Sequence, residues 1–351
     1  MYFYTAGKGA ETVSFRAGGT RWEVRRFHDM CGICGKVTRN SKQALPDGLI
    51  ERMCSKLVHR GPDDGGVYKA LGVGLGHRRL AIIDLSPEAA QPFANEDRTL
   101  FLVVNGEIYN YIKKREELES KGHRFGTHTD AEVIIHLYEE YGRSCLEHME
   151  GMFSFALWDS KRRELFAVRD RAGQKPFLYH LNGGDITFAS EMEALLEDES
   201  VPREINARGV FDYFSFSYIP APDTVFRGVF KLPPGHYLVY RDGEVKVGRY
   251  WKLSCEKRDF IGSEEEVAFR VREHLRRSVE ARLRSDVEVG VFLSGGIDSS
   301  IITAEAASCG DVRAFSVQFD EEAYDESEHA SKVARFLGIR HEIIRISTEV
   351  G

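Results

Sequence analysis

Apolar and polar positions in the first half of the chain alternate over short stretches that are separated by turns. Thr99–Asn105 (TLFLVVN) is apolar almost throughout, which is typical of a strand buried on both faces. Further strands are predicted at Leu71–Gly76, Leu80–Leu85, Phe153–Asp159, Glu164–Arg169, Phe177–His180 and Ile186–Ser190. Helices are predicted from Pro46 to about Val58 and at Tyr111–Gly122 and Asp130–Tyr141, with hairpin turns at Asn182–Asp185 and Asp242-Gly243. Many strands with few long helices indicate an α+β sandwich.

From about Glu264 the pattern changes to alternating helices and strands, which predicts a parallel α/β sheet. The predicted order is helix Glu264–Arg284, strand Val287–Leu293, helix Ser299–Cys309, strand Ala314–Phe319, helix Glu326–Leu337 and strand Glu342–Ile346. Residues 245–263 are interpreted as a linker. A doubly wound sheet usually has about five or six strands, so residues 264–351 are expected to form an incomplete α/β parallel-sheet domain.

Composition narrows the class of protein. A length of 351 residues favours two domains, and no apolar run approaches the roughly 20 residues that a membrane helix needs. The net charge is -7 and no long block of Lys or Arg occurs, so neither nucleic acid nor a membrane is expected as a partner. Six cysteines are too few for a disulfide scaffold in a chain of this length, and reduced thiols in a cytoplasm are expected.

The first residues are Gly- and Arg-rich and weakly periodic, and the hypothesis is that Met30 is the true start, with residues 1–30 outside the fold. The alternative is a short ordered N-terminal arm. If Met30 initiates and is then removed, Cys31 carries a free α-amine with a pKa near 7.7–8.0 beside its own thiol. One residue would then supply both a nucleophile and a general base.

Cys31 admits other interpretations. With Cys34 it forms a CxxC motif, which could be redox-active, half of a zinc site or an inert buried pair. No second CxxC and no His pair with zinc-finger spacing accompany it. Cys31 by itself does not decide between these alternatives.

A series of motifs in a fixed order does decide. They are MCGICG, HRGPD at 59–63, HRRLAIIDL at 77–85, QPF at 91–93, NGEIYN at 105–110, TD at 129–130, GMFSFALWD at 151–159, RDRAGQKPFLY at 169–179 and FASEMEAL at 188–195. Together they resemble the class II glutamine amidotransferase domain of glutamine-hydrolysing asparagine synthetases, over residues 31–244. The resemblance implies the αββα sandwich of N-terminal nucleophile hydrolases, with Cys31 as the nucleophile.

The resemblance also implies a role for each polar residue of a glutamine pocket. Arg60 would hold the substrate carboxylate, while Asp130, helped by Glu107, would pair with its ammonium group. The Asn105 amide and the Gly106 N–H would form the oxyanion hole. The pocket walls would include Ile82 and Ile83. The structural alternatives are a surface Arg, a helix-capping Asp and a plain Asn-Gly turn.

VGVFLSGGIDSS at 289–300 joins a predicted strand to a helix through a loop that can bind phosphate with backbone N–H groups. It lacks the Walker pattern and is similar to the loop of ATP pyrophosphatases. That similarity implies ATP binding, with Mg²⁺ near Asp298 and with adenine read at Leu293 and Val317. The residues assigned to ATP are Leu293, Ser294, Gly295, Gly296, Asp298, Ser299, Ser300 and Val317. The alternative is a Gly/Ser turn with a structural role only.

The family resemblance implies a complete reaction: glutamine gives ammonia, which amidates aspartate through β-aspartyl-AMP, yielding asparagine, AMP and diphosphate. The family often forms homodimers. The chain ends at Gly351, before the segments that would bind the acceptor, so it is expected to be truncated and to retain only the glutaminase half. The alternatives are a related amidotransferase with another acceptor, and a non-catalytic fragment that binds glutamine.

Overall fold

The computed structural model describes residues 12–17, 20–25, 30–40, 42–255, 262–321 and 325–346. The chain forms two compact units, one of Arg26–Ser254 and the other of Met1–Arg25 with Cys255–Gly351. Among the described helices, none is both long and apolar enough to cross a membrane.

The larger unit contains two six-stranded sheets in which every paired strand is antiparallel. Sheet I has the order β12 (Val229–Lys231), β10 (Leu178–Asn182), β11 (Asp185–Ala189), β3 (Gly32–Val37), β5 (Val73–Arg79) and β4 (Asp64–Ala70). Sheet II has the order β14 (Glu244–Arg249), β13 (His236–Arg241), β9 (Glu164–Arg169), β8 (Gly151–Asp159), β7 (Leu100–Ile108) and β6 (Phe93–Ala94).

The two sheets share one core. Ile33 and Leu75 from sheet I pack in the same buried cluster as Val103 and Trp158 from sheet II. Side chains of β7 alternate between this cluster and the opposite face, where Leu102 joins a different core. The prediction of a strand buried on both faces is therefore confirmed, because period-2 alternation sends its apolar side chains into two cores.

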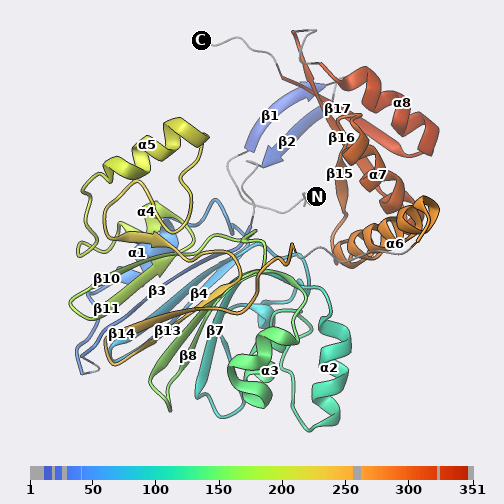
Figure 1. Cartoon of the computed structure of the whole chain (residues 1–351). Helices are drawn as coiled ribbons and strands as arrows, with labels where there is room; N and C mark the ends of the chain where they lie inside the picture. The colour runs from blue at the N-terminus through green and yellow to red at the C-terminus, as the bar shows by residue number, and fades with distance from the viewer. Residues whose placement is uncertain are drawn as a thin grey trace. The chain divides into compact units, whose positions relative to one another are not determined.

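Helices cover the outer faces of both sheets (Figure 1). Met53 of α1 (Leu49–Ser55) packs in one outer core with Cys34 of sheet I and with α4 (Met192–Leu195). Ile134 of α3 packs in the other outer core with Phe155 of sheet II. The remaining elements of this unit are η1 (Pro87–Ala89), α2 (Tyr111–Ser120), α3 (Val133–Tyr141), η2 (Gly142–Glu147) and α5 (Ala207–Phe216). Helices outside two antiparallel sheets make the predicted four-layer sandwich.

Both predicted hairpins of this unit are confirmed. Asn182 pairs with Asp185 across the β10–β11 turn, and Arg241 pairs with Glu244 across the β13–β14 turn. β14 continues to Arg249, so the sheet extends into residues predicted as linker. Residues 256–261 of that predicted linker lie outside the described residues.

The strand predicted at Leu80–Leu85 is wrong, because this segment is a loop that wraps around the Arg79 side chain. The Arg79 guanidinium donates to the carbonyls of Ile83, at 3.4 Å, and Ser86, at 2.8 Å, and also to that of Asp84. Asp84 has a φ of 57°, which no strand accommodates. The buried Arg79 side chain, and not a neighbouring strand, is therefore the hydrogen-bond partner of these carbonyls.

The smaller unit contains the predicted alternation of helices and strands. Strands β15 (Gly290–Phe292), β16 (Arg313–Phe319) and β17 (Arg340–Ile346) are parallel and adjacent in that order. The helices are α6 (Glu264–Arg282), α7 (Ile297–Cys309) and α8 (Ser327–Leu337). α6 begins with a capping box in which the Ser263 side chain accepts from the Glu266 N–H.

Within residues 1–30, predicted to lie outside the fold, β1 (Thr12–Ala17) pairs with β2 (Thr20–Arg25) as an antiparallel hairpin. Residues 1–11, 18–19 and 26–29 of that segment lie outside the described residues, as does the chain end at Gly351.

Candidate active site

Cys31 lies immediately before β3, where its thiol meets the first residue after β5. The Leu80 N–H donates to Cys31 Sγ at 3.4 Å. Burial raises the pKa of the Cys31 thiol, although the Leu80 backbone and the charges of Lys175, Arg79 and Arg60 act in the opposite direction. The resting side chain is thus a thiol, and a nucleophilic role requires a base that removes its proton.

Arg60 is buried beneath Cys31. Its Nε donates to the Cys31 carbonyl at 3.1 Å, and its Nη1 donates to Glu191 Oε1 at 2.7 Å. His59 Nε2 lies 2.8 Å from the other Glu191 oxygen. Arg60 Nη2 is buried and has no hydrogen-bond partner among the described residues. Two nitrogens of the Arg60 guanidinium are therefore hydrogen-bonded within the protein, and the third, Nη2, can bind a ligand.

Asn105 lies near the end of β7 and its side chain is 1% exposed. Neither its Oδ1 nor its Nδ2 has a hydrogen-bond partner within the described part of the chain. Both backbone polar groups of the preceding residue, Val104, face side chains. Its carbonyl lies 3.0 Å from His77 Nε2, and its N–H donates to Gln91 Oε1 at 2.7 Å. A buried amide with two unused polar atoms is costly, and a ligand that supplies the partner would remove the cost.

Gly106 follows with a φ of 152°, in the region that favours glycine. A Cβ at this position would lie 2.1 Å from the Met152 carbonyl oxygen of the neighbouring strand. A side chain could therefore not be accommodated at Gly106. The Asn-Gly pair is not a hairpin turn, because it lies within β7, whose pairing with β8 continues through Asn105, Gly106 and Glu107.

The Asp130 carboxylate is hydrogen-bonded to the end of the same strand, β7. Its Oδ2 accepts from the Ile108 N–H at 2.7 Å, and it is 4% exposed. Burial raises the pKa of Asp130 to about 6, despite the hydrogen bonds from Ile108 and Thr129 that lower it. The predicted helix here begins later, at Val133, so Asp130 does not lie in the helix but in the loop before it.

Lys175 is a residue of this site to which the sequence analysis assigned no role. It is 6% exposed, and its Nζ lies 2.9 Å from Met30 Sδ. Burial lowers the pKa of Lys175, while the negative charges of Glu107 and Cys31 raise it. Its loop is rigid because the buried Asp170 carboxylate accepts from the N–H groups of Ala172, Gln174 and Lys175, each at 3.0 Å.

Hydrogen bonds join segments of this site that are distant in the sequence. The Leu80 N–H donates to Cys31 Sγ, the His128 N–H donates to Asp84 Oδ2, and the Ile108 N–H donates to Asp130 Oδ2. Ile82 and Ile83 are half-buried in the segment between Leu80 and Asp84. Of the residues predicted for a glutamine pocket, Arg60 contacts Cys31 directly, and Asp130 contacts the end of β7, the strand that carries Asn105, Gly106 and Glu107.

Replacing Lys175 by methionine is expected to raise the pKa of the Cys31 thiol, because a nearby positive charge favours the thiolate. The rate of alkylation by iodoacetamide against pH measures this. Lys175→Arg keeps the charge and is expected to restore most of the effect. An unchanged alkylation profile in Lys175→Met would contradict a role for Lys175 in tuning the thiol.

The loop after β15 has the geometry of an anion site. Gly295 has a φ of 85°, and a Cβ there would lie 2.6 Å from the Ala330 nitrogen. Ser294 Oγ and Ser299 Oγ are 2.9 Å apart, and the buried Ser300 Oγ has no partner among the described residues. Gly296 caps the N-terminus of α7, on whose first turn Asp298 lies.

The two positions predicted to read adenine are adjacent in the small sheet. The Leu293 N–H donates to the Phe315 carbonyl at 2.8 Å, and the Ser316 hydroxyl donates to the Leu293 carbonyl. Val317 follows on the central strand β16. Backbone groups at the carboxyl ends of two neighbouring parallel strands thus meet beside the glycine loop, where ligands bind in open α/β sheets.

Comparison with known proteins identifies the class to which this site belongs. Residues 30–251 match the family model of the glutamine amidotransferase domain, and residues 270–350 match that of asparagine synthase. The chain therefore belongs to the glutamine amidotransferase family, with a partial asparagine synthase domain after it.

The curated relatives point to a particular group within this family. The chain is 37% identical over 316 residues to glutamine-hydrolysing asparagine synthetase 1 of Bacillus subtilis, a match that covers 89% of this chain and 49% of that protein. It is 36% identical over 354 residues to the amidase chyE of Penicillium rubens, covering 91% and 51% of the two proteins. The chain thus spans about half the length of these relatives.

Among solved structures, glutamine phosphoribosylpyrophosphate amidotransferase from B. subtilis matches with a TM-score of 0.46 and 18% identity, covering 89% of this chain and 65% of that one.

Proposed function

We propose that this chain hydrolyses glutamine to glutamate and ammonia, with Cys31 as the nucleophile of an N-terminal nucleophile hydrolase. The hydrogen bond from Arg60 to the Cys31 carbonyl, together with buried polar atoms of Arg60 and Asn105 that have no hydrogen-bond partner among the described residues, carries this proposal. The substrate carboxylate would bind Arg60 Nη2, and its ammonium group would face Asp130 and Glu107. Two charged ends held in this way would fix the amide over the thiol.

The reaction then needs a base, an oxyanion hole and water. The α-amine of Cys31, once it is the N-terminal residue, takes the thiol proton, and the thiolate attacks the amide carbon. Asn105 Nδ2 and the Gly106 N–H donate to the oxygen of the tetrahedral intermediate. Ammonia leaves with the proton from the α-amine, and water hydrolyses the thioester to glutamate. The test is glutamate release from glutamine by a chain that begins at Met30; no release sinks the proposal.

The pH dependence of glutamine hydrolysis should follow Asp130. Since its pKa is raised to about 6, this carboxyl is neutral below that pH, and kcat/KM for glutamine is expected to rise as pH increases through about 6. Asp130→Asn can still accept from the Ile108 N–H, so it should fold. It is expected to increase KM about ten- to a hundredfold, because a charge-assisted hydrogen bond is lost. The Asp130→Asn variant should also lack the increase in kcat/KM near pH 6. If its pH profile equals that of the unmodified chain, the role assigned to Asp130 is refuted.

We further propose that the glycine loop binds ATP and that the intact protein makes asparagine from aspartate, AMP and diphosphate being released. The steric restriction at Gly295, the unpartnered Ser300 hydroxyl and the N-terminus of α7 all fit an anionic phosphate chain. Asp298 would hold Mg²⁺, and the backbone at Leu293 and Val317 would bind adenine. A bound Mg²⁺ supplies charge neutralisation between the phosphates of ATP. Protection of α7 from proteolysis by ATP with Mg²⁺ tests this half.

A second candidate keeps the glutaminase half and changes the acceptor of the ammonia. The 36% identity to a protein that is named an amidase supports this second candidate. Ammonia transfer to aspartate by the full-length protein distinguishes the two. A cytoplasmic location and a homodimer are proposed on the family resemblance, and gel filtration tests the dimer.

A further inference from the structure

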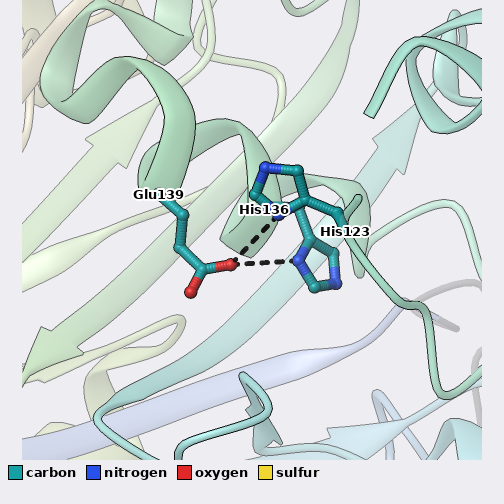
Figure 2. Close-up of side chains that lie close together, drawn as sticks. All are labelled: His123, His136 and Glu139. Atoms are coloured by element: carbon teal, nitrogen blue, oxygen red, sulfur yellow. Dashed lines mark hydrogen bonds and ion pairs between the residues drawn. The ribbon is translucent and has the colours of Figure 1, made fainter. Parts of the chain in front are cut away.

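A cluster of two histidines and a glutamate lies on α3 and in the loop after α2, and the proposed function uses none of the three. His123 lies in the loop after α2, while His136 and Glu139 lie on α3. Figure 2 shows both imidazole rings turned toward one carboxylate oxygen of Glu139. We propose that His123, His136 and Glu139 bind a zinc ion.

The distances match a first coordination shell. Glu139 Oε2 lies 3.0 Å from His136 Nδ1 and 3.5 Å from His123 Nδ1. The three ligand atoms lie within 4.8 Å of one another. Bonds of about 2.0–2.1 Å in tetrahedral geometry place zinc ligands about 3.3 Å apart, so small side-chain shifts suffice. Two imidazoles and one carboxylate are also a donor set that zinc accepts, with the fourth position left for water.

The outer contacts are those that hold metal ligands in place. The second nitrogen of each imidazole faces a carboxylate: His136 Nε2 is 3.8 Å from Glu132 Oε1, and His123 Nε2 is 3.6 Å from Glu140 Oε2. Asn95 Nδ2 donates to the other oxygen of Glu139 at 2.8 Å, which leaves Oε2 for the imidazoles. Carboxylates behind ligating histidines set the tautomer and increase the basicity of the ring.

Burial and charge favour a cation at this position. His136 is 1% exposed, whereas His123 is half-buried and Glu139 is reached by solvent. Three carboxylates, of Glu132, Glu139 and Glu140, surround the two rings.

The cluster is connected to the segment that carries Asp130. Glu132 accepts from the N–H groups of Gly126, at 2.7 Å, and Thr127, at 2.8 Å. Since Glu132 also faces His136, an ion bound to His136 would stabilise the segment that carries Asp130. The zinc proposal does not depend on glutamine hydrolysis, because it rests on these distances alone.

Titration of the full chain with Co²⁺, followed by competition with Zn²⁺, tests the proposal. Cobalt is expected to bind with the visible spectrum of a four-coordinate nitrogen and oxygen site, and one equivalent of zinc should abolish it. His123→Ala and Glu139→Gln should each weaken binding at least about tenfold. The matched control His274→Ala removes an exposed imidazole from α6 and should bind as the unmodified chain does.

The cysteines need a separate control, since thiolates also bind zinc. The titration is therefore repeated in the Cys31→Ala background, where the cobalt spectrum should be unchanged and should lack sulfur-to-metal charge-transfer bands. Unaltered affinity in both His123→Ala and Glu139→Gln, or no binding by the full chain, would overturn the proposal. The second outcome would identify the cluster as a network of hydrogen bonds and ion pairs only.

Discussion

Replacing Cys31 by alanine is expected to reduce glutamine hydrolysis by at least about a thousandfold, to the level that binding and the oxyanion hole alone support. The sulfur is the atom that would form the covalent intermediate, and the Leu80 N–H holds it in place. Ammonia and glutamate release by a chain that begins at Met30 measures the loss. Cys255→Ala removes an exposed thiol and should have no effect.

A variant of this experiment distinguishes the contribution of the Cys31 thiol from that of the α-amine that acts as its base. A chain in which Met30 remains joined to Cys31 keeps the sulfur but has no free α-amine. We expect it to be almost as inactive toward glutamine as Cys31→Ala, although iodoacetamide still alkylates its thiol. Full activity in this blocked chain would mean that another group, with Lys175 the nearest candidate, removes the proton. Full activity in Cys31→Ala would remove the basis of the proposed function.

The second large effect is expected for Asn105→Ala, which should lower kcat by about 10²–10³ while changing KM little. The Asn105 amide has no hydrogen-bond partner among the described residues, so removing it breaks no hydrogen bond among them. A donor used only by the oxyanion contributes to the transition state and not to substrate binding. Steady-state kinetics of glutamate release measure both constants.

Stability provides the control for Asn105. Because the unpaired amide is buried at a cost, Asn105→Ala should unfold at the same or a higher denaturant concentration than the unmodified chain. Asn110→Ala is the matched variant: its side chain donates to the His148 carbonyl at 2.9 Å and accepts from the Glu150 N–H at 3.1 Å. It should lose stability and keep kcat. A marked loss of stability in Asn105→Ala with an unchanged kcat would show that this amide is structural.

Local patterns determined much of the architecture. Apolar runs predicted the central strand at Thr99–Asn105, and Gly-rich turns predicted both hairpins, since these features depend on neighbours in the chain. The change to alternating elements near Glu264 predicted the parallel sheet of the smaller unit. The strand predicted at Leu80–Leu85 failed because the side chain of the adjacent Arg79 binds carbonyls of this segment, a contact that the apolar pattern does not encode.

The order of residue types in the motifs predicted the candidate residues of the site, among them Cys31, Arg60, Asn105 and Asp130. Motifs carry no information on pairing between distant segments. The folded chain was therefore needed to show which atoms are already paired, such as the Arg60 nitrogen on Glu191, and which have no hydrogen-bond partner among the described residues. It also decided the placement of Lys175 beside Cys31 and of His123 beside His136, since burial and electrostatic contact arise between segments that no local pattern connects.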